Sequence, residues 1–421
     1  MEVIAPSSTT ASKPQAGSVF KVRRVTDLAL VLLFLSGLCV PLIGVQIGSH
    51  GWDIGARGEN RKMAPLPALL RPQPLSTPRE KVKAVAKFPG DFKYYLSDHF
   101  GLRNLLIRLH ATVMVKGLGV SSSEAVTMGK DGWLYLANDG AIEDWRNTEP
   151  FTPAQIEGWR KMLEERQQFC AARGIPYLFV FTPSKHDIYP EYMPDRIPRF
   201  STDSRVDQLI RYLKEEKSPV EILDLRGPLL KARKKGIRLF CKTDTHWNDR
   251  GAWVGYLAIM DAIHRRVPQI EPLPESDFEP FTVMKPAGDL SRLLGLQDAL
   301  QEESLDLVPR IRLRLPPESI EGDMTDPVTV NADPNAPKLP RIVVFRDSFM
   351  TMLLPWVAQR FGRGVYLWED GFDRSVIEAE RPDIVVQEFT SRKLYRVLST
   401  LENRDELQLV NGRWQLRTPR S

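Results

Sequence analysis

Three polar residues in this chain have side chains that could together carry out acyl transfer. Asp244 and His246 are separated by one residue in the segment KTDTHWNDRGAW, and Ser348 follows the apolar run RIVVF. A serine hydroxyl is a weak nucleophile until a base removes its proton, and a histidine can be that base. A carboxylate beside the histidine fixes its tautomer and stabilises its protonated form. These residue types therefore indicate a serine nucleophile activated by an aspartate–histidine pair.

Alternating apolar strands and amphipathic helices must position these side chains. From residue 151 onward, short apolar runs alternate with helical patterns, which is the arrangement of a mostly parallel sheet covered on both faces. We therefore expect a three-layer α/β domain. Its predicted strands are 176–181, 220–225, 341–345, 364–368 and 383–389, and its predicted helices are 152–174, 204–216, 250–266, 350–360 and 373–380.

The carboxyl ends of the strands are where reacting groups collect in open α/β sheets. Ser348 stands where the 341–345 strand gives way to a helix, and N–H groups in the first helical turn could stabilise an oxyanion. Asp244 and His246 should point the same way if their segment is extended, because side chains alternate along a strand. We further expect β structure at 310–315 and 327–330 and a Pro-rich surface loop at 267–287.

Other interpretations of the same residues remain open. A serine after a buried strand is commonly a helix cap, and an Asp-x-His pair is commonly a structural hydrogen bond. Asp244, His246 and Asp249 offer ligands for a metal ion, although no further histidine stands beside them. His186, which follows another buried strand, is a rival base. We expect no metal and no cofactor.

A long apolar segment precedes the α/β region. Residues 28–47 carry no charge over 20 positions, a length that spans the hydrocarbon core of a bilayer. Lys21, Arg23 and Arg24 flank its N-terminal side, so the positive-inside rule keeps the short N-terminus in the cytoplasm and exports the rest. We expect an uncleaved anchor, rather than a cleaved signal peptide, in a single-pass protein of the cell membrane.

The predicted anchor divides the chain into five segments. They are a disordered cytoplasmic tail (1–24), the transmembrane anchor (25–48), an extended Pro-rich linker (49–90), the α/β domain (91–400) and a C-terminal tail (401–421).

Bulk composition excludes some functions. A hydrophobic content of 42% and a charged content of 26% are those of a globular protein, and the net charge of +5 is mild. The basic residues form no stripe with interleaved aromatics, so we expect no nucleic-acid partner. Cys170 and Cys241 could pair or stay free, because they belong to neither a C-x-x-C motif nor a disulfide framework.

Six segments resemble a known family. KTDTHWNDRGAW and VVFRDSF are similar to the Asp-x-His-Trp and Gly-Asp-Ser-Phe motifs of the AlgX/AlgJ-like alginate O-acetyltransferases, which carry an SGNH-hydrolase-like domain. The segments ENRKMAPLP (59–67), GKDGWLYL (129–136), TPSKHDIYPEYMP (182–194) and AGDLSRLLGL (287–296) also fit this family. The resemblance therefore runs from about residue 59 to 395.

The resemblance implies an SGNH-type α/β fold with Asp244, His246 and Ser348 as the catalytic residues. It implies a membrane-anchored, periplasm-facing protein that acetylates an exopolysaccharide, with a multi-pass membrane acyltransferase as the source of the acetyl group. The positions expected to bind substrate or to support the site are Lys185, Trp247, Arg346, Asp347 and Arg392.

One position departs from the family motif. Arg346 stands where the family has a glycine before Asp-Ser. A glycine permits a tight turn and close approach of a substrate, whereas a guanidinium could crowd the site or bind an anionic sugar. The leading hypothesis is acetyl transfer through an acetyl-serine at Ser348. A carbohydrate acetyl esterase using the same residues, or a catalytically silent polysaccharide-binding scaffold, are the alternatives.

Overall fold

Two units make up the chain, Met1–Val113 and Met114–Ser421. In this computed structural model the described residues are 27–36, 64–72, 77–98, 103–297, 299–315, 328–396, 407–410 and 413–416.

The first unit contains separate helices. Residues 27–36 are helical, and η1 (Ala68–Leu70), α2 (Pro78–Asp98) and α3 (Arg103–Thr112) follow. The other residues of the predicted anchor, 25–26 and 37–48, lie outside the described residues. Among the helices that are described, none has both the length and the apolar character needed to cross a bilayer.

The last part of the predicted extended linker, residues 78–90, is helical instead. The hydroxyl of Thr77 accepts a hydrogen bond from the N–H of Glu80, and the Glu80 carboxylate accepts one from the N–H of Thr77. This capping box starts a helix, and Pro78 at the first helical position costs no hydrogen bond. The prediction of extended structure was therefore wrong for these residues.

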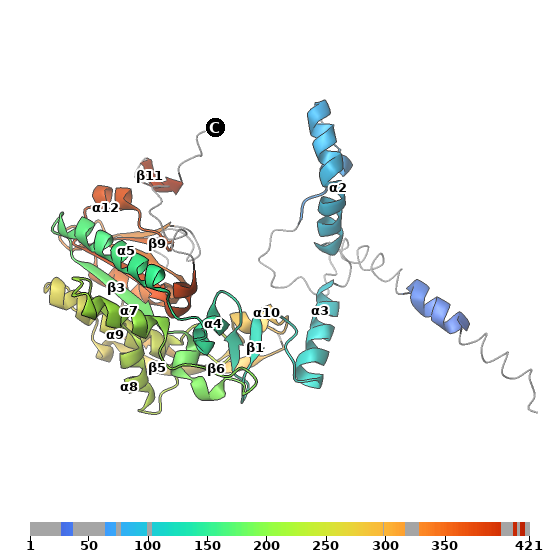
Figure 1. Ribbon diagram of the computed structural model, residues 1–421, viewed down its shortest axis with the longest axis horizontal. Coiled ribbons are helices and arrows are strands. Elements are labelled where there is room, and N and C mark those ends of the chain that lie inside the picture. Colours follow the sequence, from blue (N-terminus) through green and yellow to red (C-terminus); the bar gives the residue numbers. More distant parts are fainter. Residues whose placement is uncertain are drawn as a thin grey trace, which may run out of the picture. The chain divides into compact units, whose positions relative to one another are not determined.

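A six-stranded sheet forms the centre of the second unit (Figure 1). Five of its strands run parallel, and β7 runs antiparallel to β9 at one edge. The sheet is therefore mostly parallel, as predicted, and the antiparallel edge strand β7 makes it mixed. Its order is β4 (Ile222–Asp224), β3 (Tyr177–Thr182), β10 (Ile384–Thr390), β8 (Arg341–Arg346), β9 (Arg363–Trp368) and β7 (Val328–Ala332).

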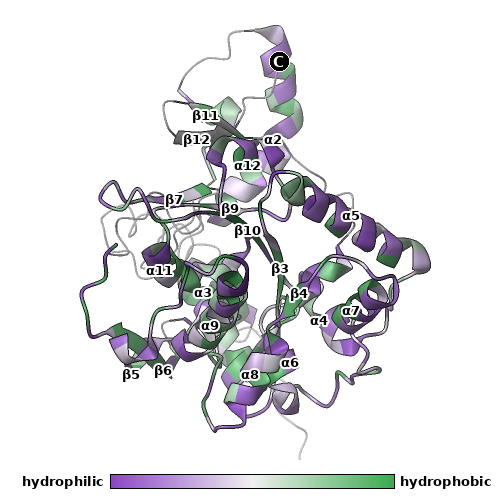
Figure 2. Ribbon diagram, turned by 90° about the vertical axis from the view of Figure 1, so that its left-hand side faces the viewer, coloured by the Kyte–Doolittle hydropathy of each residue, from purple (hydrophilic) through white to green (hydrophobic). Residues whose placement is uncertain are grey.

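Helices cover both faces of this sheet. Figure 2 shows α5 (Pro153–Ala171) and α7 (Arg205–Glu215) on one side of the strands, and α9 (Asp249–Arg266) and α11 (Leu354–Val357) on the other. Successive side chains of a strand point to opposite faces. Phe179 of β3 accordingly packs in the core under α5 and α7, whereas Leu178 packs in the core under α9. The predicted three layers are confirmed.

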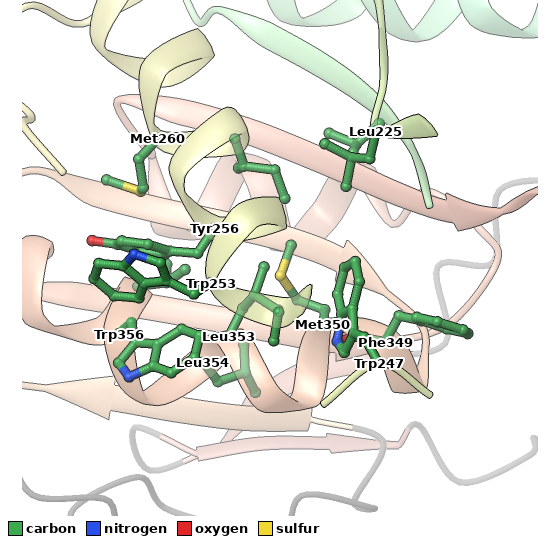
Figure 3. Close-up of a cluster of buried hydrophobic side chains, with 14 of the residues drawn as sticks. Leu225, Trp247, Trp253, Tyr256, Met260, Phe349, Met350, Leu353, Leu354 and Trp356 are labelled. Atoms are coloured by element: carbon green, nitrogen blue, oxygen red, sulfur yellow. The ribbon is translucent and has the colours of Figure 1, made fainter. Parts of the chain in front are cut away.

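Aromatic packing joins α9 to the segment that follows β8, which contains η6 (Ser348–Leu353) and α11. In Figure 3, Trp253 and Tyr256 of α9 lie against Trp356 of α11. The ring centroids of Trp253 and Trp356 are 5.1 Å apart, with the rings nearly perpendicular. This buried contact brings the start of α9 close to η6, so the residues just before α9 can meet those of η6.

The region between α9 and β7 differs from the prediction. Residues 278–286, predicted as loop, form β5 (Phe278–Pro286), which pairs antiparallel with β6 (Gln301–Pro309). A two-stranded ribbon has free edges, and prolines such as Pro280 and Pro286 are tolerated there. Residues 310–315, predicted as β, form no strand. Arg314 instead turns its guanidinium onto the carbonyl oxygens of Ala358 and Gln359.

The remaining elements are shorter. Helix α8 was not predicted, because Gly227 and Pro228 near its start are typical of turns. In addition, β11 and β12 form a hairpin within the predicted C-terminal tail. These elements are η2 (Val113–Gly117), β1 (Val126–Met128), β2 (Leu134–Leu136), α4 (Ala141–Arg146), α6 (Lys185–Ile188), η3 (Pro190–Tyr192), α8 (Arg226–Arg233), η4 (Glu275–Asp277), α10 (Asp289–Leu293), η7 (Ala358–Arg360), α12 (Arg374–Glu380), η8 (Ser391–Tyr395), β11 (Leu407–Val410) and β12 (Arg413–Leu416).

Candidate active site

The segment that carries Asp244 and His246 folds back on itself just before α9. Phe240 and Trp247 form an isolated antiparallel bridge, and Asn248 caps the first turn of α9 with its side chain. The expected extended conformation is wrong, because residues 242–246 form a series of bends. Asp244 and His246 meet across this bend, where Asp244 Oδ1 accepts a hydrogen bond from the main-chain N–H of His246 at 2.9 Å.

Ser348 is placed by the end of β8. Arg346 is the last residue of the strand, and Asp347 caps η6 by accepting the N–H of Phe349 at 2.9 Å. Ser348 therefore opens η6 at the carboxyl edge of the sheet and stays partly exposed. The helix predicted at 350–360 begins two residues earlier, as a short 3-10 segment followed by α11 and η7.

The three predicted residues are hydrogen bonded in series. Asp244 Oδ1 lies 2.7 Å from Nδ1 of His246, and Nε2 of the same imidazole lies 2.7 Å from Oγ of Ser348. Both ring nitrogens are thus engaged, one by a carboxylate and one by an alcohol. This is the arrangement in which an imidazole can take a proton from a hydroxyl while the carboxylate stabilises the resulting imidazolium.

Asp244 and His246 each stabilise the charged form of the other. Burial alone would raise the pKa of Asp244, but the hydrogen bonds and positive charge of His246 outweigh it and hold that pKa well below its usual value. Burial would lower the pKa of His246, but Asp244 outweighs burial and raises the pKa above 6.5. His246 is therefore a stronger base than an ordinary histidine, paired with a carboxylate that stays ionised.

Lys185 stabilises the bend at residues 242–246 through hydrogen bonds to main-chain carbonyl oxygens. Its side chain is buried, and Nζ donates to the carbonyl oxygens of Leu134 at 2.7 Å, Cys241 at 2.9 Å and Lys242 at 3.1 Å. Burial lowers the pKa of this ammonium to about 8. Lys185 therefore links β2 to the segment before Asp244 and supports the position of Asp244.

Trp247 and Arg346 also lie in the interior. Trp247 is 1% exposed and its Nε1–H donates to the carbonyl oxygen of Phe349 at 3.2 Å. Arg346 is completely buried, with Nη1 2.9 Å from Oγ1 of Thr351 and the guanidinium over the ring of Trp368. The expectation that this guanidinium crowds the site or contacts a sugar is therefore wrong, because the group packs inside the fold.

Asp347 anchors the turn that presents Ser348. Its carboxylate accepts the N–H and hydroxyl of Thr390 and lies 3.2 Å from Nζ of Lys393. Its own N–H donates to Glu388 Oε2 at 2.9 Å. Burial and the charge of Asp347 raise the pKa of Glu388 to about 8, so Glu388 is the neutral member of this carboxyl pair at neutral pH.

Arg392 is the predicted supporting residue whose positive charge acts on His246. Its Nε donates to Asp139 at 3.2 Å, and its guanidinium lies 5.8 Å from the centre of the Phe349 ring. The Phe349 ring in turn lies 4.9 Å from that of His246. The positive charge of Arg392 opposes the effect of Asp244 and lowers the pKa of His246.

Two site residues were missed from the sequence, Gly288 and Asp289. The N–H of Asp289 donates to Asp244 Oδ2 at 2.9 Å, and Asp289 Oδ1 accepts the N–H of Thr245 at 2.6 Å. The segment AGDLSRLLGL that contains them shows only a family resemblance in the sequence. A glycine directly before an acidic helix start was the available signal, but nothing in the sequence placed it beside Asp244.

The rival groups lie elsewhere. Nε2 of His186 is 3.2 Å from Asp144 Oδ2, in a buried cluster with Ser184, Asp187 and Ser391. Asp249 accepts the N–H of Leu307 and does not join Asp244. Among the residues that the structure describes, two groups have donor atoms close enough to share a cation, namely Asp144, His186 and Asp187, and Asp244, His246 and Asp289. Cys170 and Cys241 are both free.

Comparison with known proteins finds similarity over part of the chain. Residues 126–329 match the family described as an SGNH hydrolase-like domain, acetyltransferase AlgX. A "Probable alginate O-acetylase AlgJ" from Pseudomonas syringae pv. tomato is 27% identical over 259 residues, which are 61% of this chain and 61% of that relative. The protein of the same name from Pseudomonas putida is 26% identical over 293 residues, 68% of each chain.

A solved structure gives a further comparison. The structure of Bacillus cereus PatB1 covers 65% of this chain and 98% of its own, with a TM-score of 0.49 and 17% sequence identity. The match to the Pseudomonas syringae relative spans less than two thirds of that protein's length. The chain is therefore similar to the AlgX/AlgJ-like acetyltransferases, and residues 126–329 match their SGNH hydrolase-like domain.

Proposed function

We propose that this protein is a polysaccharide O-acetyltransferase that works through an acetyl-serine at Ser348. The observation that carries the proposal is the series of two 2.7 Å contacts from Asp244 through His246 to Ser348. Relatives named alginate O-acetylase support acetyl transfer to a polysaccharide, and they favour alginate as the acceptor.

In the first half-reaction, Oγ of Ser348 attacks the carbonyl carbon of the acetyl donor while Nε2 of His246 takes the hydroxyl proton. The carbonyl oxygen becomes an oxyanion. Because Asp347 already engages the N–H of Phe349, we assign the oxyanion to the N–H of Ser348. The tetrahedral intermediate collapses, the imidazolium returns its proton to the leaving group, and an acetyl ester remains on Ser348.

In the second half-reaction, a sugar hydroxyl takes the place of the leaving group. Nε2 of His246 accepts the proton of that hydroxyl as its oxygen attacks the acetyl carbon. The bond to Oγ then breaks, the proton returns to Ser348, and the acetylated sugar departs. Asp244 stays ionised and stabilises the imidazolium in both halves. Arg392, beside the Phe349 ring, is the side chain we assign to an incoming anionic sugar.

Location and partner extend the proposal. The uncharged segment 28–47 with Lys21, Arg23 and Arg24 before it supports a membrane anchor that leaves the α/β domain in the periplasm. A multi-pass membrane acyltransferase is then the natural source of the acetyl group, because acetyl donors are made in the cytoplasm. A cysteine placed after residue 48 should react with a membrane-impermeant thiol reagent in intact spheroplasts.

Intact-protein mass spectrometry of the full chain tests the chemistry. The protein is mixed with p-nitrophenyl acetate, with and without mannuronate oligosaccharides, and both protein and sugar are analysed. We expect an acetyl adduct on the peptide that contains Ser348 and acetylated oligosaccharide when sugar is present. Ser348→Ala should lose the adduct and several orders of magnitude in rate.

A matched control separates chemistry from folding. Ser276→Ala changes an exposed serine in η4 and should behave as the wild type. Normal acetylation by Ser348→Ala would rule the mechanism out. An adduct with release of free acetate only, and no acetylated sugar, would identify a carbohydrate esterase. Sugar binding without any adduct would identify a catalytically silent scaffold.

A further inference from the structure

We propose that Asp289 is a positioning residue for the Asp244–His246 pair, holding both the Asp244 carboxylate and the chain beside it so that the imidazole faces Ser348. This inference rests on the proposed function, because it concerns the same histidine. It adds a second acidic residue, 45 positions downstream of Asp244, to the residues that arrange the site.

Asp289 forms two hydrogen bonds with the segment that contains Asp244 and His246. Its main-chain N–H donates to Oδ2 of Asp244 at 2.9 Å, while Oδ1 of Asp244 accepts from His246. Its side-chain Oδ1 accepts the N–H of Thr245, between those two residues, at 2.6 Å. One hydrogen bond thus fixes the rotation of the Asp244 carboxylate, and the other fixes the peptide that connects Asp244 to His246.

The start of α10 is itself tied to the same segment. The N–H of Gly288 donates to Oγ1 of Thr243 at 2.9 Å, and the N–H of Leu290 donates to the carbonyl oxygen of Thr243 at 3.1 Å. Leu290 is fully buried, so it anchors α10 in the core. Asp289 therefore acts from a rigid support on both sides, as a positioning group requires.

Charge gives Asp289 a second effect that packing alone would not produce. Its Oδ2 lies 3.8 Å from Nδ1 of His246. The charged groups that face this imidazole come from three elements, namely Asp244 on its own segment, Asp289 at the start of α10 and Arg392 on η8, and the hydroxyl of Ser348 faces it from η6. Asp244 and Asp289 raise the pKa of His246, and Arg392 lowers it.

Two substitutions separate the hydrogen bond from the charge. In Asp289→Asn, the amide oxygen can still accept the N–H of Thr245, but the negative charge near Nδ1 is gone. In Asp289→Ala, both are lost, although the main-chain N–H to Asp244 remains. Asp195→Asn is the matched control, because Asp195 is an exposed aspartate that pairs with Lys130 on the surface.

The test measures kcat and KM of the full chain with p-nitrophenyl acetate as a function of pH. We expect Asp289→Ala to lose about ten- to a hundredfold in kcat with little change in KM, as is usual for partners behind a reacting group. We expect Asp289→Asn to recover much of kcat but to move the acidic limb of the profile to lower pH, because His246 loses an anion that favours its protonated form.

An independent readout keeps this inference separate from the proposed function. The titration of His246 in the resting protein is followed by NMR, with His246→Gln used to assign its resonance. A lower midpoint in Asp289→Asn than in Asp195→Asn supports the inference even if no acetyl transfer is found. An unchanged midpoint, together with wild-type kcat in Asp289→Ala, would overturn it. A wild-type protein that forms no adduct at Ser348 would count against the proposed function alone.

Discussion

Gly288 and Asp244 are so close that the chain has no room for a side chain at position 288. A Cβ atom placed on Gly288 would lie 2.3 Å from Cβ and 2.4 Å from Oδ2 of Asp244. Non-bonded heavy atoms in proteins do not approach this closely, so a side chain at position 288 would have to displace Asp244. The backbone angles of Gly288 are ordinary for any residue, so its glycine is required by this contact and not by its conformation.

Gly288→Ala should therefore reduce activity by displacing Asp244. A shift of about 1 Å in a catalytic group can cost about a hundredfold in rate, and we expect a loss of that order in kcat/KM for p-nitrophenyl acetate. Gly227→Ala is the control, because a Cβ atom there meets no atom within 4 Å. Wild-type activity in a folded Gly288→Ala protein would contradict the tight contact.

The raised pKa of His246 makes a prediction for the wild-type protein. A general base works only when neutral, so kcat/KM should rise with pH through the pKa of His246 and then level off. Because Asp244 outweighs burial and raises that pKa, the midpoint should lie above 6.5. The measurement is the pH profile for p-nitrophenyl acetate after subtraction of the Ser348→Ala rate. A midpoint below 6.5 would show that burial and Arg392 prevail instead.

Much of the fold could be predicted because hydrophobic periodicity and helix capping residues are local signals in the sequence. The apolar run at Tyr177–Thr182 and the capping box at Thr152 and Gln155 mark β3 and α5, and both elements formed as expected. The antiparallel edge strand β7 could not be predicted as such, since strand direction depends on which neighbour it pairs with. The prolines of residues 278–286 indicate a loop and hide a strand, whose pairing partner begins fifteen residues further on, at Gln301.

The candidate site was predicted only in part, for a related reason. Asp244, His246 and Ser348 have recognisable chemistry, and the position of Ser348 after a strand followed from general rules of α/β sheets. Asp289 is an ordinary surface-type residue in sequence, and its role arises only when α10 folds against Thr243 and Thr245. Long-range contacts of this kind leave no trace in residue spacing.

Glu388 should make the stability of the protein depend on pH. Its pKa is raised from 4.5 to about 8 by burial and by Asp347, so the folded state binds a proton more tightly than the unfolded state. The free energy of unfolding therefore falls as pH rises from about 4.5 to about 8, and the penalty is complete above that range. Glu388→Gln can still accept the N–H of Asp347 and should remove this fall.

Thermal unfolding at several pH values provides the measurement for Glu388→Gln. Glu221→Gln is the control, because Glu221 is an exposed surface carboxylate that pairs with Arg266. The melting temperature of Glu388→Gln should decline less than that of the control between acidic and mildly alkaline pH. An equal decline in the two variants would mean that Glu388 is ionised in the folded protein at neutral pH.

Arg346 allows a direct test of the departure from the family motif. The guanidinium is completely buried, over the Trp368 ring and bonded to Thr351, and burial lowers its pKa to about 10. Arg346→Gly should therefore leave a cavity and cost about 3 kcal/mol of unfolding free energy, as other large-to-small core substitutions do. It should not open the site, because the side chain does not stand between Ser348 and solvent.

Urea unfolding and acetyl-ester kinetics of Arg346→Gly check both parts. Arg346→Met, which keeps the aliphatic stem, should restore part of the stability, and Arg310→Gly at an exposed position should change it far less. Activity per folded molecule should stay at or below the wild-type value in Arg346→Gly. A gain in transfer to oligosaccharides, without a loss of stability, would mean that the guanidinium reaches the acceptor site and restrains the enzyme.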